Sequence, residues 1–491
     1  MTPRTRIPRT GRDPAPLLAE MASFRDHDVR YQEGRSWSLV YYVGEAHEDV
    51  LRQAQALYIS ANALNPMAFR SLKQMETEVV QMTAEMLHGP PSCVGTMTCG
   101  GTESLLLAVK AYRDRARRRR PWIRRPNIVA PATIHVAFDK AAHYFGVNLR
   151  LVPVGLDGQV DPRAMARRVN RNTILLAASA PQYANGAVDP IPEIGALAER
   201  RGLPLHVDAC FGGFIQPWLE RLGVSMPQFD FRVPGVTSVS ADVHKYGYAA
   251  KGASVVLYRD MAYLKHQFFV ATRWSGGIYA SPGVLGARPG GPIAGAWASL
   301  MAMGEDGFVA KAREAWDAAE KLRAGIREIP QLRLLGQPHS TIVTYGVEER
   351  AVDLYAVADQ LQERGWGVDR QQRPPSIHCT VNAANLPVVD RYLADLRAAV
   401  AHVEAHPELA TEGEAAMYGM MAKVPVRGLV GRRVLEVMEQ MYGPEGEMPD
   451  LAASGAEQGG PVVRAVLDWG DRAISAAKRV GHRVRHPFEE P

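Results

Sequence analysis

A lysine and an aspartate, each next to an apolar run typical of a β-strand, are the residues of this chain best suited to covalent chemistry. Lys245 follows the run 236–239, and Asp208 ends the run 205–208, 37 positions earlier. A lysine amine forms an imine with an aldehyde, and a carboxylate keeps a pyridine nitrogen protonated. The pair therefore predicts an enzyme that uses pyridoxal 5′-phosphate (PLP), with Lys245 attached to the cofactor and Asp208 at its ring nitrogen.

A glycine pair before an apolar helix and a histidine after a strand would complete this cofactor site. Glycines that open a helix let the backbone approach an anion, and the helix N-terminus attracts a phosphate. An imidazole after the run 127–130 would stack on the pyridine ring. Each motif alone is weak, because glycines also cap helices and single histidines are more often structural. The expected cofactor contacts are Gly100, Gly101, Thr102, His135, Asp208, His244 and Lys245.

Short apolar runs alternate with helical stretches from Cys93 to about Tyr258. This alternation predicts an α/β fold whose mostly parallel sheet is wrapped by helices, with ligands beyond the carboxyl ends of the strands. A helix from Ala294 to about Ile329 is expected to connect this part to a smaller α/β domain. The expected division is an N-terminal arm and helical segment (1–90), a large PLP-binding domain (91–330), a small C-terminal domain (331–450) and an extension (451–491).

The bulk composition excludes several other classes of protein. The net charge of +5 over 491 residues is mild, and the basic run 117–120 lacks the interleaved aromatic residues typical of nucleic-acid binding. The four cysteines show no CxxC spacing, so we expect neither a metal site nor disulfides. The same cysteine pattern leads us to expect a cytoplasmic location. The sequence contains no apolar stretch of about 18 residues, so we expect no membrane span.

Beyond these separate signals, the chain resembles the sphingosine-1-phosphate lyase family of fold-type I, group II PLP-dependent decarboxylases. The resemblance covers most of the chain and lies in the motifs 99–104, 206–214, 238–254, 274–279 and 286–290. It implies a fold-type I PLP-dependent transferase-like fold. It also implies a homodimer with active sites at the subunit interface.

The resemblance also implies roles for individual side chains. Lys245 becomes the PLP-binding lysine, Asp208 the partner of the ring nitrogen and His135 the stacking imidazole. Tyr183 and Lys251 become active-site assistants. The expected substrate-binding residues are Lys251, Asn65, Tyr41 or Tyr42, and Arg288.

Three positions depart from the family pattern at places associated with the substrate's phosphate. Asn65 stands where a histidine is usual, and Gly283 and Ala287 stand where hydroxyl residues are usual. Imidazolium and hydroxyl groups are suited to holding a phosphate. The departures leave the cofactor chemistry intact but leave the phosphate state of the substrate open.

The leading interpretation is a carbon–carbon lyase. It would cleave a 2-amino-3-hydroxy substrate, such as a sphingoid-base phosphate, by a retro-aldol reaction to an aldehyde and an amine. Tyr183 or the released Lys245 would take the proton of the C3 hydroxyl. The alternative is a PLP-dependent amino-acid decarboxylase that acts on a non-phosphorylated substrate. A third interpretation, an inactive binding protein, is disfavoured by the intact Lys245, Asp208 and His135.

Overall fold

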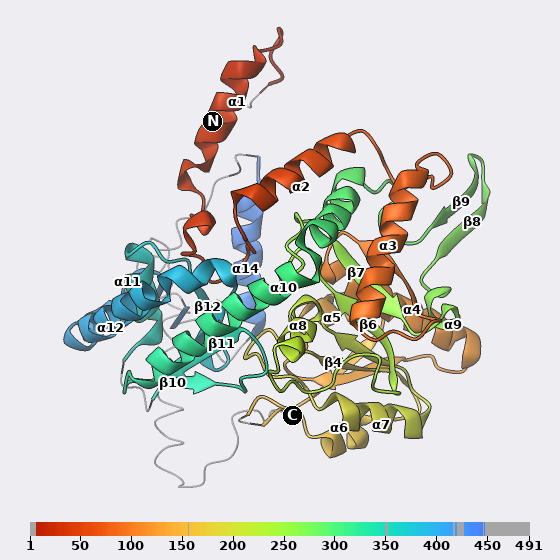
Figure 1. Ribbon diagram of the computed structural model, residues 1–491. Coiled ribbons are helices and arrows are strands. Elements are labelled where there is room, and N and C mark those ends of the chain that lie inside the picture. The colour runs from red at the N-terminus through yellow and green to blue at the C-terminus, as the bar shows by residue number, and fades with distance from the viewer. Residues whose placement is uncertain are drawn as a thin grey trace.

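A seven-stranded sheet forms the centre of the computed structural model, which describes residues 6–155, 157–348, 352–415, 418, 419, 427–444 and 446 (Figure 1). The strand order is β1-β7-β6-β5-β4-β2-β3, and only β7 runs antiparallel to its neighbours. This arrangement confirms the predicted α/β class. The strands are β1 (Val94–Thr98), β2 (Asn127–Pro131), β3 (Asn148–Val152), β4 (Thr173–Ser179), β5 (Leu205–Asp208), β6 (Val236–Ala241) and β7 (Ser254–Tyr258).

Helices pack on both faces of this sheet, so its inner strands are buried along their whole length. Strand β7 shows the two layers most clearly. Val255 and Leu257 belong to the core on one face, whereas Val256 and Tyr258 belong to the core on the other. The covering helices include α4 (Gly101–Arg119), α5 (Ala137–Phe145), α6 (Pro162–Arg168), α7 (Ile191–Arg201), α8 (Gln216–Arg221) and α9 (Met261–Leu264), with the 3-10 turn η3 (Gly212–Phe214) before α8.

A second, four-stranded antiparallel sheet forms the smaller part of the molecule, in the order β10-β11-β13-β12. Its own core includes Trp37 from the N-terminal arm, whose ring lies 6.1 Å from Trp366 and 4.6 Å from Tyr392. Its elements are β10 (Leu332–Leu335), β11 (Ile342–Val347), α11 (Leu354–Glu363), β12 (Asp369–Gln372), β13 (Pro375–Thr380), η4 (Ala383–Val388), α12 (Val389–Ala405) and η5 (Pro407–Thr411).

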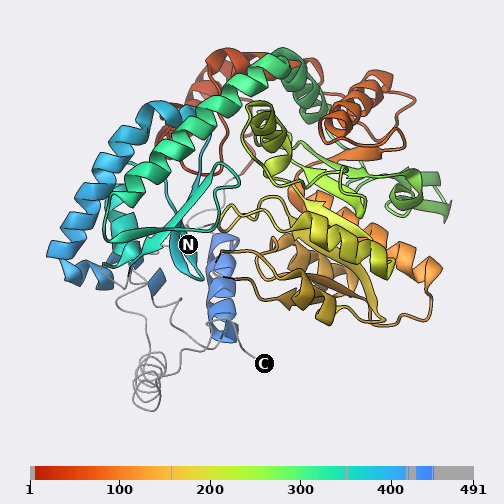
Figure 2. The same cartoon turned by 60° about the horizontal axis from the view of Figure 1, so that its bottom comes forward.

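The long helix α10 (Gly290–Arg327) joins the two parts, as Figures 1 and 2 show. It bends at Gly304, whose φ of 57° interrupts the helical backbone. The chain thus has a connector helix where the sequence predicts one. The exact domain boundaries stay predictions, and the expected extension 451–491 lies outside the described residues.

Two segments project from the rest of the molecule. Helix α1 (Pro14–Ser23) extends outward and has no buried residue, and the hairpin of β8 (Phe269–Trp274) and β9 (Gly277–Ser281) protrudes at the other end (Figure 1). Among the described residues, no helix combines the length and apolar character needed to cross a membrane. The remaining elements are η1 (Phe24–His27), η2 (Tyr31–Glu33), α2 (Glu45–Leu57), α3 (Arg70–Met86) and α14 (Arg427–Met441).

Candidate active site

Five of the segments singled out in the sequence follow strand ends at one edge of the large sheet. Gly101 follows β1, His135 follows β2, Tyr183 follows β4, Asp208 ends β5, and Lys245 follows β6. Strand β1 points the same way as β6, because both run antiparallel to β7 between them. The carboxyl ends of all five strands therefore meet at the same edge, where open α/β sheets bind ligands.

Lys245 forms a close ion pair with a buried acid. Its Nζ lies 3.0 Å from Oδ2 of Asp242 and 5.9 Å from the ring centre of Phe211. Burial alone would lower the pKa of Lys245, but the Asp242 carboxylate raises it above its ordinary value. The amine is thus held as an ammonium ion. Asp242 is not among the residues predicted from the sequence, because its local signal, an i,i+3 spacing from the lysine, is also common in ordinary turns.

The glycine pair lies directly against this ion pair. A β-carbon at Gly101 would come within 2.8 Å of Oδ2 of Asp242 and within 2.8 Å of Sγ of Cys210, so only glycine fits. A β-carbon at Gly100 would lie 3.6 Å from Cε1 of His244. Helix α4 therefore begins beside His244 and Asp242, and its N-cap residue offers no side chain that caps its amides. The start of the helix is open to an anion.

His244 supplies a further polar atom at the start of α4. Its Nε2 lies 3.7 Å from Oδ2 of Asp242, whereas its Nδ1 is buried without a hydrogen-bond partner among the described residues. Burial lowers the pKa of His244 to about 4, so the ring is neutral near pH 7. A buried, unpaired ring nitrogen beside an uncapped helix start fits the phosphate of PLP.

Asp208 and His135 are held in defined orientations. Oδ1 of the buried Asp208 accepts a hydrogen bond from the Cys210 amide at 3.1 Å, and Asp208 pairs in register with Ser240 on β6. Asp208 also contributes to the raised pKa of Lys245. Nδ1 of His135 accepts a hydrogen bond from the Ala137 amide at 3.1 Å, which leaves the ring hydrogen on Nε2. The stacking of His135 on the cofactor stays a prediction.

Of the two tyrosines expected near the entrance, Tyr41 lies in the site. Its ring lies 4.9 Å from that of Tyr246, and Nζ of Lys251 lies 5.2 Å above it. Burial and the Asp242 carboxylate raise the pKa of Tyr41. Tyr42 instead packs on Tyr31, with 5.8 Å between ring centres. The structure thus distinguishes Tyr41 from Tyr42 as the tyrosine beside Lys251, a distinction that the sequence alone does not give.

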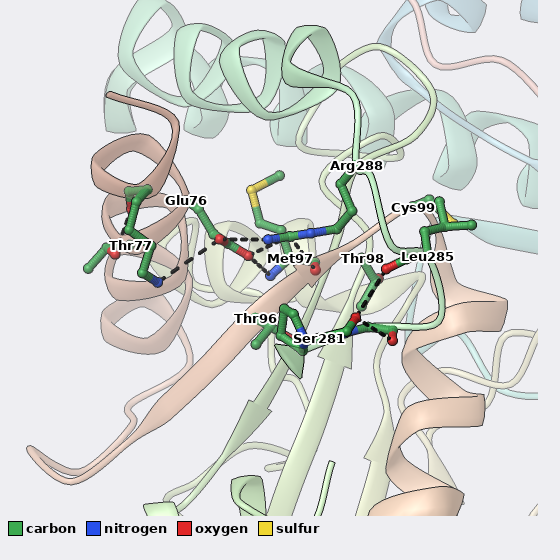
Figure 3. Close-up of polar contacts among 12 residues, drawn as sticks. Glu76, Thr77, Thr96, Met97, Thr98, Cys99, Ser281, Leu285 and Arg288 are labelled. Carbon is green, nitrogen blue, oxygen red and sulfur yellow. Dashed lines mark hydrogen bonds and ion pairs between the residues drawn. The ribbon is translucent and has the colours of Figure 1, made fainter. Parts of the chain in front are cut away.

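Arg288 is brought together with an acid rather than with Lys245. Its guanidinium is buried and donates to Glu76 of α3 at 2.7 and 3.1 Å, and to the carbonyl of Met97 at 3.4 Å (Figure 3). Glu76 also accepts from the Met97 amide. These bonds fix the segment before α10 against α3 and β1. A substrate contact of Arg288 stays a prediction, and the observed contacts assign it a structural task.

The three positions that depart from the family pattern lie in two places. Asn65 is exposed, and its side chain accepts from the amides of Met67 and Ala68 at 3.0 and 3.3 Å. The segment of Gly283 is tied to α4, because the next amide, that of Val284, donates to Glu103 at 2.8 Å. Neither hydrogen bond of the Asn65 side chain links it to the segment that carries Lys245. Its predicted substrate contact stays a prediction.

Comparison with known proteins agrees with this geometry. Residues 54–348 match the model of the pyridoxal-dependent decarboxylase conserved domain. The chain is therefore a PLP-dependent lyase, which confirms the predicted cofactor and enzyme class. Residues at the sheet edge fit that cofactor: the start of α4 and His244 at the phosphate, Asp208 at the ring nitrogen, and Lys245 at the aldehyde carbon.

Full-length relatives define the family more closely. The chain is 43% identical to the sphingosine-1-phosphate lyase of Arabidopsis thaliana, over 87% of this chain and 79% of that protein. Sphingosine-1-phosphate lyase 1 of Rattus norvegicus is 40% identical, over 89% of this chain and 77% of that protein. A solved structure of a Burkholderia pseudomallei sphingosine-1-phosphate lyase superposes with a TM-score of 0.80 at 36% identity, covering 88% of this chain and 97% of that one. The chain belongs to the sphingosine-1-phosphate lyase family, and the decarboxylase alternative is not favoured.

The Lys245–Asp242 pair leads to a prediction about cofactor uptake. Attachment of PLP needs the neutral amine, and Asp242 holds the proton on it. We expect Asp242→Asn to shift the pH profile of PLP uptake to lower pH. Each unit by which the pKa of Lys245 falls should make uptake at neutral pH about tenfold faster. Visible absorbance of the attached cofactor measures the rate. Lys245→Ala serves as the control without attachment, and overlapping profiles for Asp242→Asn and the unaltered protein would contradict the assignment.

Proposed function

We propose that this enzyme cleaves a phosphorylated sphingoid base between C2 and C3, releasing a long-chain aldehyde and phosphoethanolamine. The observation that carries the proposal is a second cation in the site. Lys251 lies over the ring of Tyr41, close enough to Lys245 for the two charges to repel each other. One lysine attaches the cofactor, so the other is available to a substrate anion. The names of the matched relatives support a phosphate as that anion.

The chain's own residues divide the remaining tasks. PLP, once bound, supplies the electron sink for the pair released from the broken carbon–carbon bond. Asp208 would keep the ring nitrogen of the cofactor protonated, and Lys245 would hold the cofactor covalently through its amine. Tyr41 and Lys251 lie together beside Lys245, and Tyr183 approaches from the end of β4. A substrate hydroxyl and phosphate would thus be held from different elements.

Product analysis tests the substrate directly. Incubation of the PLP-loaded enzyme with a phosphorylated sphingoid base is expected to yield equal amounts of long-chain aldehyde and phosphoethanolamine, without carbon dioxide. The unphosphorylated base should react more slowly, because it lacks the group that Lys251 binds. Release of carbon dioxide from an amino-acid panel, with no aldehyde from the sphingoid phosphate, would instead support the decarboxylase.

Lys251 should make substrate binding pH-dependent. Desolvation of its ammonium group and the nearby Lys245 cation lower the pKa of Lys251 to about 8. Its charge is therefore present below this pH and lost above it, and we expect KM for the phosphorylated base to rise as pH increases through about 8. In Lys251→Gln, KM should be higher by about tenfold or more and should lose this rise, since a charged hydrogen bond contributes about 1.5–3 kcal/mol. Lys265→Gln, on the exposed end of α9, is the matched control. A rise that persists in Lys251→Gln would refute the assignment.

The exposed hairpin supports a homodimer as part of this proposal. The side chains of Phe269, Trp274 and Ile278 are 56, 60 and 82% exposed, although water is an unfavourable neighbour for such groups. Helix α1 likewise exposes Leu18 and has no buried residue. A second copy of the chain would cover both segments, in line with the dimer that the family resemblance implies.

Sedimentation or light scattering checks the oligomeric state. The unaltered protein should have the mass of a dimer, and Ile278→Glu should shift it toward the monomer, because the charge would be buried at the interface. Trp122→Glu, at an exposed aromatic residue shortly after α4, should leave the mass unchanged. A monomeric unaltered protein would refute the dimer.

A further inference from the structure

One hydrogen bond at the candidate site joins a side chain of the large part to the small sheet. Tyr183 belongs to the turn after β4 of the large sheet, and Asp369 is the first residue of β12 in the small sheet. The hydroxyl of Tyr183 donates to Oδ2 of Asp369 at 2.9 Å. The orientation of an active-site tyrosine therefore depends on a carboxylate 186 residues away in the sequence.

The ring of Tyr183 is supported by a neutral histidine on the neighbouring strand. It lies 4.2 Å from the ring centre of His378, with 31° between the planes. His378 and Asp369 are register partners on β13 and β12, so one strand pair contacts both the face and the hydroxyl of the tyrosine. Burial lowers the pKa of His378 to about 3, and its Nε2 hydrogen-bonds to Thr380 at 2.9 Å. The histidine is a fixed, uncharged platform.

The backbone of the same turn is also fixed to the small sheet. Thr344 of β11 donates to the Ala184 carbonyl at 3.0 Å, and Ser340 donates to the Gly186 carbonyl at 3.1 Å. Both hydroxyls are buried. Tyr183 is thus held through its ring, its hydroxyl and the adjacent backbone, and each contact comes from the small part of the molecule.

The direction of the hydroxyl hydrogen determines what Tyr183 offers to a substrate. Because this hydrogen points to Asp369, the oxygen presents only lone pairs to the rest of the site. Burial and the Asp369 charge raise the pKa of Tyr183 above its ordinary value, whereas Lys245 acts in the opposite direction, which places the phenol within the field of that lysine. Near neutral pH the group is a phenol whose oxygen is free to accept a hydrogen bond from a substrate hydroxyl.

We propose that Asp369 is a positioning residue for carbon–carbon cleavage, which orients Tyr183 and accepts its proton. The inference rests on the proposed function. As the O–H bond of the C3 hydroxyl breaks, that proton passes to the Tyr183 oxygen and the original Tyr183 proton passes to Asp369. The electron pair left on the substrate oxygen forms the carbonyl of the aldehyde. PLP, once bound, would supply the electron sink for the pair of the breaking C2–C3 bond, so atoms and charge balance.

Asp369→Asn is the critical variant, because an amide oxygen still accepts the phenol hydrogen but cannot take the proton. We expect kcat to fall by about 100-fold, the scale of a lost acid–base group, with KM and PLP absorbance little changed. Tyr183→Phe should lose a similar factor, and the double variant should lose no more than either single one. Asp390→Asn, at an exposed acid of α12, is the matched control with unchanged kcat. Additive losses, or a change in KM alone, would overturn the relay.

A second measurement needs no substrate. The ultraviolet phenolate band, taken as the difference between a protein and its Tyr183→Phe counterpart, reports the ionisation of Tyr183. Asp369→Asn should move this ionisation to lower pH, since the neighbouring negative charge is gone. An unmoved titration would overturn the coupling. If the titration moves but no aldehyde forms, the coupling stands and the proposed substrate fails.

Discussion

The buried ion pair between Lys245 and Asp242 is the interaction around which the candidate site is built. A carboxylate this deeply buried is unfavourable unless a cation and polar groups compensate for its lost hydration, and removal of one partner from such a pair typically costs about 3–5 kcal/mol. Asp242 has the ammonium at 3.0 Å as its compensating cation, with the His244 ring 3.7 Å away, while its Oδ1 is buried without a hydrogen-bond partner among the described residues. The same crowding leaves room only for glycine at position 101. One charge pair thus determines the residue type at the position where a phosphate would approach.

The sheet topology explains why distant residues share this site. Each of these strands contributes a residue at its carboxyl end or within a few positions after it, and the shared direction of the strands brings these ends to one edge. The antiparallel β7 does not break the pattern, because it allows β1 to run in the same direction as β6. The loop after β1 with its glycine pair can then lie against the loop after β6 with its lysine. The cofactor contacts depend on this pairing more than on any single motif.

Local patterns predicted much of the fold and part of the site. Apolar runs ending in Asp208 or preceding Lys245 are readable as buried strands, because both faces of a parallel sheet are covered. The sequence could not show that Asp369 faces Tyr183, because that contact depends on how the small sheet packs. It likewise could not separate Tyr41 from Tyr42, which differ only in which way the backbone turns each ring. Arg288 was expected at the substrate, and its partner Glu76 lies 212 positions away.

The charges around Lys245 form a balanced set rather than a single ion pair. Asp242 holds the proton on Lys245, and this cation in turn lowers the pKa of Lys251. Desolvation lowers the pKa of Lys251 as well, so the charge of this side chain depends both on its burial and on its neighbour. The lysine expected to bind the cofactor and the lysine proposed to bind the substrate are therefore coupled through charge.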